Sequence, residues 1–335
     1  MSLPGRPKGK FRKAQPEGTP VTDFASLVNP QAIAAARLRI GADVRHTPLL
    51  RLPGPLLGVG CAELWLKLEQ LQIGGSFKAR GMFNRMRSWP IPAAGVIIAS
   101  GGNAGIAVAC ASRALGVRCE VFLPELSSPA KRQALAALQA QVVVGGAAYS
   151  DALAACLLRQ QETGAMMMHA YDQPEVVVGA GTLAAEIEAD AGLPDCVLVS
   201  VGGGGLIAGI AAWFEGRCRV EALEPAGSPT LHAAREAGAP VDVAVGGLAA
   251  DALGARRVGA IAWEISQQHV AASHLLPEDA IRDAQRLLWS ELRLAVEPAG
   301  ALPLAAVRCG AVAPSPHEKI ALVLCGANFD PAGLS

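Results

Sequence analysis

The sequence predicts an α/β protein built on open, mostly parallel sheets flanked by helices. Short β-rich runs alternate with longer helical stretches, and several of these runs are continuously apolar. Strands that are buried on both faces of a parallel sheet show this pattern. The 335 residues are 51% hydrophobic and 4% aromatic and include 37 glycines, which suits tightly packed α/β layers. The length favours one large or two medium domains.

The predicted elements follow one another with short links. Strands are expected at 64–68, 96–99, 118–123, 142–144, 166–169, 197–201, 220–223 and 320–324, and helices at 30–40, 103–115, 130–138, 206–214 and 278–291. Asn29-Pro30 and Ser128-Pro129 mark helix starts, because a capping side chain precedes a proline. In right-handed βαβ units of this kind, ligands bind beyond the carboxyl ends of the strands. The functional loops should therefore follow strands directly.

Charge and cysteine content argue against several classes of protein. Lys plus Arg equals Asp plus Glu at 29 each, so no overall field attracts nucleic acid or an anionic membrane. No stretch approaches the roughly 18 apolar residues of a membrane span. Residues 1–20 form a basic tail that we expect to be disordered. The eight cysteines form no CxxC pair and no zinc-finger spacing, which indicates a reducing cytoplasm and no structural zinc.

Two loops that follow strands present candidate groups near helix starts. In residues 74–81, Ser76 is expected to cap a helix whose first turn holds Lys78. A helix N-terminus favours a neutral amine, which imine chemistry needs, although a solvated lysine is the more common interpretation of this loop alone. In residues 100–105, two glycines and a helix start would seat a carboxylate. Asn103 in this loop either caps the helix or reaches the ligand.

Two later loops complete the set. The glycines Gly202, Gly203, Gly204 and Gly205 lie between a strand and a helix, where backbone amides cradle phosphate. The same loop satisfies a dinucleotide pattern through Ala208, with Glu224 about 20 residues on, so NAD stays an alternative here. Cys325 ends the last predicted strand. Taken alone, it is better interpreted as a buried packing residue.

Taken in order, these loops resemble the fold-type II pyridoxal-phosphate family, specifically the serine/threonine dehydratases and their serine racemase relatives. Further matching segments are Lys67-Leu68-Glu69, His169-Ala170-Tyr171-Asp172, Gly181-Thr182 and Glu297-Pro298-Ala299-Gly300-Ala301. The resemblance runs from about Thr47 to Asn328. It implies a two-domain fold like that of the tryptophan synthase β subunit, with the cofactor in the cleft between the domains. The small domain, 61–165, would be inserted in a large domain made of 21–60 and 166–335.

The resemblance also implies roles for individual residues. Lys78 would be the catalytic residue that carries pyridoxal 5′-phosphate as an imine and takes the Cα proton. The cofactor would be held by Phe77, Lys78, Asn103, Gly202, Gly203, Gly204, Gly205, Leu206 and Cys325, and the substrate by Ser76, Ser100, Gly101, Gly102, Asn103 and Ala104. Glu224 matches one ligand of a divalent-metal site, but Thr230 replaces the partner Asp, so a monovalent cation such as K⁺ is the better expectation.

The implied activity is a dehydratase, or ammonia-lyase, that converts L-threonine or L-serine to a 2-oxo acid and ammonia. Gly101 stands where racemases of the family place a serine as second base, which favours the lyase. A same-fold racemase or β-replacing transferase is the first alternative, and an NAD-dependent oxidoreductase is the more distant one. The chain ends ten residues after Cys325, which leaves no room for a regulatory domain and favours amino-acid catabolism. We expect a cytoplasmic homodimer or homotetramer.

Overall fold

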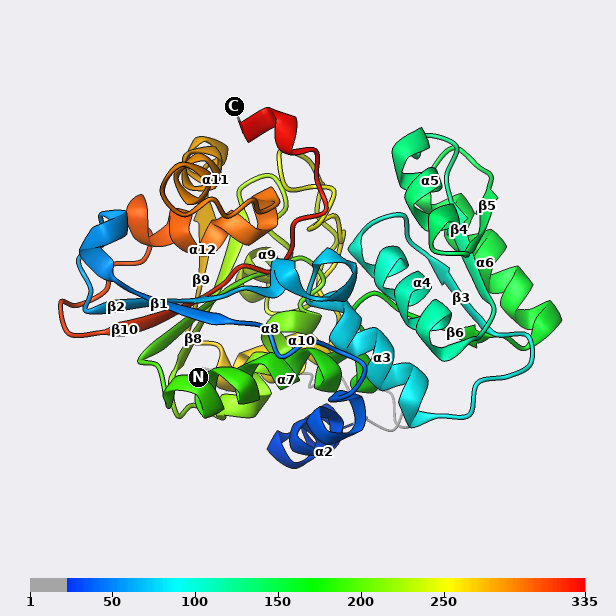
Figure 1. Ribbon diagram of the computed structural model, residues 1–335, viewed down its shortest axis with the longest axis horizontal. Coiled ribbons are helices and arrows are strands. Elements are labelled where there is room, and N and C mark those ends of the chain that lie inside the picture. Colours follow the sequence, from blue (N-terminus) through cyan, green and yellow to red (C-terminus); the bar gives the residue numbers. More distant parts are fainter. Residues whose placement is uncertain (1–22, 335) are drawn as a thin grey trace, which may run out of the picture.

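The computed structural model describes residues 23–334 and arranges them around two sheets (Figure 1). The larger sheet has six strands in the order β1-β2-β10-β7-β8-β9, and the smaller has four in the order β5-β4-β3-β6. Every neighbouring pair is parallel except β1 and β2. The strands are β1 Leu49–Pro53, β2 Glu63–Lys67, β3 Val96–Ala99, β4 Cys119–Leu123, β5 Gln141–Val144, β6 Met166–Met167, β7 Cys196–Ser200, β8 Arg219–Pro225, β9 Ala272–Leu276 and β10 Lys319–Val323.

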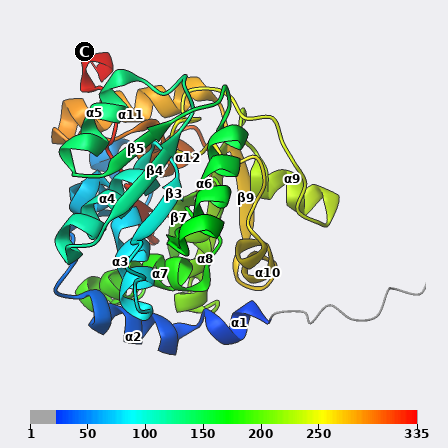
Figure 2. The same cartoon turned by 90° about the vertical axis from the view of Figure 1, so that its right-hand side faces the viewer.

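Helices cover both faces of the six-stranded sheet, with α11 and α12 on one face and α7, α8 and α10 on the other (Figure 1). Turning the molecule by 90° brings the four-stranded sheet and its helices α4, α5 and α6 to the front (Figure 2). The helices are α1 Phe24–Leu27, α2 Pro30–Ile40, α3 Lys78–Ser88, α4 Asn103–Leu115, α5 Pro129–Ala137, α6 Tyr149–Thr163, α7 Pro174–Ala191, α8 Gly205–Phe214, α9 Thr230–Ala237, α10 Ala260–His269, α11 Glu278–Leu292 and α12 Pro298–Arg308. None of these helices combines the length and apolarity needed to cross a bilayer.

Most predicted elements are confirmed to within a residue or two. The strand predicted at 96–99 is β3 itself, whereas the one predicted at 166–169 keeps only Met166–Met167. Two strands were missed. Leu49–Pro53 is a partly exposed antiparallel edge strand that ends in proline, and Ala272–Leu276 contains Ser273 and His274. Neither has the continuous apolar run that predicted the others.

The strand pairing corrects the predicted insert, 61–165, at both of its ends. Strand β2 pairs with β1 and β10 in the larger sheet, although it falls inside the predicted small domain. Strand β6 pairs with β3 in the smaller sheet, just beyond the predicted end. The β2–β10 pairing joins distant parts of the chain, so no local pattern predicts it. The basic tail at 1–20 lies outside the described residues.

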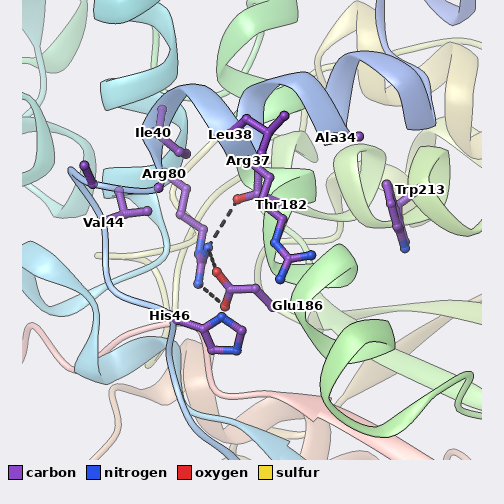
Figure 3. A pocket seen from close by; sticks show the side chains of 12 residues that line it. Ala34, Arg37, Leu38, Ile40, Val44, His46, Arg80, Thr182, Glu186 and Trp213 are labelled. Carbon is purple, nitrogen blue, oxygen red and sulfur yellow. Dashed lines mark hydrogen bonds and ion pairs between the residues drawn. The ribbon is translucent and has the colours of Figure 1, made fainter.

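A buried cluster of four charges fixes the start of α3, the helix that begins at Lys78. Arg80 donates to Glu69 Oε1 at 2.8 Å and to Glu186 Oε1 at 2.6 Å, and Lys67 Nζ lies 2.6 Å from Glu186 Oε2. All four side chains are at most 5% exposed. Figure 3 shows Arg80 held between Thr182 and Glu186 beneath α2. The cluster joins β2 and its following turn to α3 and α7, with equal numbers of positive and negative charges.

Replacing Arg80 by methionine should destabilise the protein by about 3–5 kcal/mol, because the buried Glu69 loses its ion-pair partner and Glu186 keeps only Lys67. The matched control is Arg51→Met, which breaks an ion pair with Glu63 whose side chains are 50% and 30% exposed and should cost less than about 1 kcal/mol. Urea unfolding of both variants measures the difference. Equal losses of stability would contradict a structural role for the buried cluster.

Candidate active site

One cavity collects the residues that follow the strands at the meeting point of the two sheets. Lys78 begins α3, Asn103 begins α4, the glycine turn joins β7 to α8, and Cys325 follows β10. The residues of the predicted site that line this cavity are Phe77, Lys78, Asn103, Gly202, Gly203, Gly204, Gly205, Leu206 and Cys325. The structure therefore brings the whole predicted cofactor set together.

The surroundings of Lys78 favour the neutral form of its amine. Its Nζ donates a hydrogen bond to the carbonyl oxygen of Ala170 at 2.6 Å. Burial lowers the pKa of Lys78 to about 8, although the nearby Cys325 and Glu297 oppose the shift. Near pH 8, the neutral fraction of the Lys78 amine is larger than that of a solvated lysine. Only a neutral amine is nucleophilic.

The glycine turn is shaped for an anion. Gly204 has φ of 88°, and α8 starts at the next residue without a side-chain cap among the described residues. The first backbone N–H groups of a helix lack acceptors within it, and the helix dipole adds partial positive charge there. A Cβ at Gly203 would lie 2.3 Å from ring carbons of Tyr171, so this position has no room for a side chain. These features fit a phosphate group.

Asn103 is fixed by side chains on two other segments. Its Nδ2 donates to Glu297 Oε1 at 2.7 Å, and its Oδ1 accepts from Asn328 Nδ2 at 2.7 Å. Gly102 is the N-cap of α4, so the capping interpretation of Asn103 is wrong and the side chain reaches into the cavity instead. Burial raises the pKa of Glu297 to about 7, with the bond from Asn103 opposing the shift. The second N–H of the Asn103 amide is left for a ligand oxygen.

Cys325 is a neutral thiol. Burial, followed by the charge of Glu297, raises the pKa of Cys325 well above its ordinary value. Its carbonyl oxygen accepts from the backbone N–H of Phe77 at 3.0 Å, which ties the end of β10 to the residue before Lys78. The amine, the uncapped glycine turn, the Asn103 amide and this thiol together fit pyridoxal phosphate.

A second cavity lies beside this one and shares Asn103 and Glu297 with it. Three residues of the predicted substrate set line neither cavity. Ser76 is extended and pairs with Gly326, and Phe77 takes the N-cap position, so the predicted Ser76 cap is wrong. The Ser76 hydroxyl is buried without a hydrogen-bond partner in the described chain. Ala104 packs in the core of the smaller sheet, and Ser100 is partly buried behind the loop. Gly101 and Gly102 do line the neighbouring cavity, together with Asn103.

Glu224 has a structural role instead of the predicted ones. Its carboxylate accepts hydrogen bonds from the backbone N–H groups of Leu231 and His232 and from the hydroxyls of Thr230 and Ser273. It therefore holds the start of α9, and its oxygens are already used by four donors. This geometry argues against Glu224 as a cation ligand and against the dinucleotide interpretation, in which it would bind a ribose.

Three residues of the site were given no role from sequence. Glu297 and Tyr171 belong to matched segments, but nothing local shows that Glu297 faces Asn103 or that the Tyr171 ring packs on Gly203. Asn328 follows the last strand, and its Nδ2 also donates to Gly74 O at 2.7 Å. Each contact joins segments far apart in the chain. The available signal was their position directly after strands or in matched segments.

The fold and this cavity define an α/β enzyme with a desolvated lysine amine where two mostly parallel sheets meet. Residues 40–326 match the family model described as "Pyridoxal-phosphate dependent enzyme". The chain therefore belongs to the pyridoxal-phosphate dependent enzymes and has their fold-type II architecture.

Individual relatives agree with this placement. The chain is 32% identical over 323 residues to a phenylserine dehydratase of Ralstonia pickettii, covering 92% of this chain and 96% of the relative. An L-threonine ammonia-lyase of Geobacter sulfurreducens is 37% identical, over 89% of this chain and 75% of its own. Among solved structures, a threonine deaminase from T.th. has a TM-score of 0.84 at 35% identity, covering 90% and 99% of the two chains. Maize serine racemase has a TM-score of 0.86 at 26% identity, covering 92% and 96%.

Cofactor-free Lys78→Met should be more stable than cofactor-free wild-type protein at pH 7. The folded state lowers the pKa of Lys78 to about 8, so it disfavours the ammonium that the unfolded chain carries. The difference should reach at most about 3 kcal/mol below pH 8 and disappear as the pH rises toward the ordinary lysine value. Urea unfolding between pH 6 and 10 measures it. Lys319→Met, at an exposed side chain, is the matched control. A stability difference for Lys78→Met that does not change with pH would show that the Lys78 amine is not desolvated.

Glu297→Ala should weaken pyridoxal-phosphate binding to the cofactor-free protein by roughly tenfold, because the Asn103 amide loses the acceptor that orients it. Glu297→Gln should keep the affinity within about threefold, since an amide oxygen can still accept from Asn103. Fluorescence titration with the cofactor measures both. Equal affinities for the two variants would contradict the orienting role of Glu297.

Proposed function

We propose that this enzyme is an ammonia-lyase, or dehydratase, that removes water and then ammonia from a β-hydroxy amino acid and releases the 2-oxo acid. L-Threonine and L-serine are the first compounds to test. The supporting observation is the single cavity that joins the Lys78 amine, the uncapped glycine turn, the Asn103 amide and the neutral Cys325 thiol. The names of relatives that cover most of the chain agree with it.

Bound pyridoxal phosphate supplies an electron sink for the charge that develops at the substrate Cα. The chain supplies the rest. The glycine turn and the start of α8 would bind the phosphate, and the second N–H of Asn103 would donate to the ring hydroxyl. The lowered pKa of Lys78 leaves a larger fraction of its Nζ neutral. This amine would hold the cofactor and would accept the Cα proton of the substrate. The neutral Cys325 thiol cannot stabilise a proton on the pyridine nitrogen as a carboxylate would, which favours loss of the β-hydroxyl over reprotonation at Cα.

The loop before α4 supports the lyase over a racemase. Gly101 and Gly102 precede the helix start, where backbone N–H groups favour the substrate carboxylate. A Cβ at Gly101 would lie 2.9 Å from Leu123 Cδ2, so Leu123 occupies the space that a larger side chain would need. Without a hydroxyl at position 101, that position offers no second base for the opposite face of Cα. Ser100 in this loop and Ser76 before α3 line neither cavity and would be more distant supports for the carboxylate.

Further parts of the proposal concern the whole assembly. A cytoplasmic homodimer or homotetramer working in amino-acid catabolism is consistent with a balanced charge and eight cysteines without a pairing pattern. The same features offer nothing to bind nucleic acid or a membrane surface. The mechanism needs no cation at Glu224, whose oxygens are used by four donors.

The test is spectroscopic and chemical. Purified protein reconstituted with pyridoxal phosphate should be yellow, and Lys78→Ala should lose the near-visible band together with 2-oxo-acid release, whereas Lys319→Ala keeps both. Chiral chromatography after incubation with L-serine should show pyruvate and at most traces of D-serine. A colourless reconstituted protein would exclude the proposed chemistry. D-serine as the main product would identify a racemase instead.

A further inference from the structure

A second cavity opens beside the catalytic one and is large for a small substrate. It shares Asn103, Ala252 and Glu297 with the catalytic cavity and has a volume of about 330 Å³. Gly101 and Gly102, where the substrate carboxylate is expected, also line it. A substrate held between Lys78 and this loop would therefore direct its β-substituent along this space.

The walls of the second cavity are largely apolar and come from four segments. Ile106 lies on α4, Leu248 and Ala249 on the loop before α10, Pro298 at the start of α12, and Phe329 and Leu334 near the C-terminal end of the described chain. Ala249 is 1% exposed and Leu334 is 9% exposed, while Phe329 is partly buried. Polar side chains, among them Gln285 and Asn328, line the same cavity between these apolar residues. Apolar surface with convergent polar groups is typical of a site for a small-molecule ligand.

The charges at the rim are of both signs and do not select a charged side chain. Lys131 on α5 lies 2.9 Å from Asp251, and Arg282 and Asp330 line the same opening. Glu297 is buried against Asn103, and burial raises its pKa to about 7, so it offers no cation-binding charge of full strength and its ionised fraction repels an acidic substituent. An uncharged substituent is therefore favoured over a carboxylate or an amine.

Size decides between a methyl and a larger group. The methyl of threonine would leave most of the 330 Å³ to water in contact with apolar walls. A cavity of about 150 Å³ is sufficient to hold benzene. A phenyl ring on Cβ would occupy the space that threonine and serine leave unfilled, and its burial would add binding energy in proportion to the apolar area removed from water.

We propose that the second cavity is the subsite for the β-substituent and that it takes an aryl group, so that the substrate class is the 3-aryl-3-hydroxy amino acids. This assignment rests on the lyase function proposed above. With phenylserine, the Cα proton and the β-hydroxyl leave as water, and the resulting enamine tautomerises to an imine. Water then adds to the imine carbon and ammonia leaves, which gives 3-phenyl-2-oxopropanoate without any oxidant or reductant.

Steady-state assays of 2-oxo-acid release by the holoenzyme test the assignment. We expect kcat/KM for phenylserine to exceed that for L-threonine by at least about tenfold, and 3-hydroxyaspartate to be the poorest substrate. If threonine or serine is turned over as well as or better than phenylserine, the aryl subsite is wrong and the lyase function stands. If no β-hydroxy amino acid yields a 2-oxo acid, the lyase function fails and the subsite fails with it.

Binding without turnover gives a second readout. L-Phenylalanine and L-alanine lack the leaving hydroxyl, so titration of the cofactor absorbance with each reports binding alone. The dissociation constant for phenylalanine should be at least about tenfold lower. Equal constants would overturn the subsite whatever the activities show.

Two variants locate the effect in the second cavity. Ala249 lines this cavity and not the catalytic one, and Ala249→Leu should lower the phenylserine-to-threonine ratio of kcat/KM by about tenfold as the space is filled. Phe329→Ala removes a partly buried side chain from the wall of this cavity and should lower the same ratio. It serves as the second test in case Ala249→Leu does not fold. Leu38→Ala, at a side chain that is 87% exposed on α2, is the matched control. An unchanged ratio in the wall variants would overturn the assignment.

Discussion

The buried cluster around Arg80 is the constraint on which the position of Lys78 depends. Arg80 lies two residues after Lys78, and its guanidinium holds carboxylates from the turn after β2 and from α7. Ionised groups placed in a dry interior tolerate little displacement, because each needs its partner. The cluster therefore fixes the first turn of α3 against the larger sheet, and the Lys78 amine is presented to the cavity from a rigid base.

Burial acts on three neighbouring groups in the cavity, and in each case it favours the uncharged form. It lowers the pKa of Lys78 and raises the pKa values of Glu297 and Cys325. A neutral amine can attach a cofactor, and a neutral thiol leaves the ring nitrogen without a fixed negative partner. The same desolvation thus prepares the nucleophile and moderates the electron sink, which are the two properties that a dehydratase needs.

The sequence predicted the parts of the site that depend on local pattern and on ordered motifs. Lys78, the glycine turn and Cys325 each follow a strand, and all three line one cavity. The pairing of β2 with β10 and the contact of Glu297 with Asn103 join distant segments, so no local signal marked them. The capping role predicted for Ser76 is wrong, and the hydrogen bonds made by Glu224 were not predicted, for a related reason. Their partners, Gly326 and the start of α9, become visible only when the chain is folded.

The place of β10 in the larger sheet has a consequence for synthesis in the cell. This strand lies between β2 and β7, yet it is translated long after both of them. Until it emerges from the ribosome, β2 and β7 have no shared neighbour, and Cys325 and Asn328 are absent from the cleft. A nascent chain therefore cannot acquire its cofactor domain by domain. Loading has to wait until β10 and the residues that follow it, Cys325 and Asn328, have been synthesised.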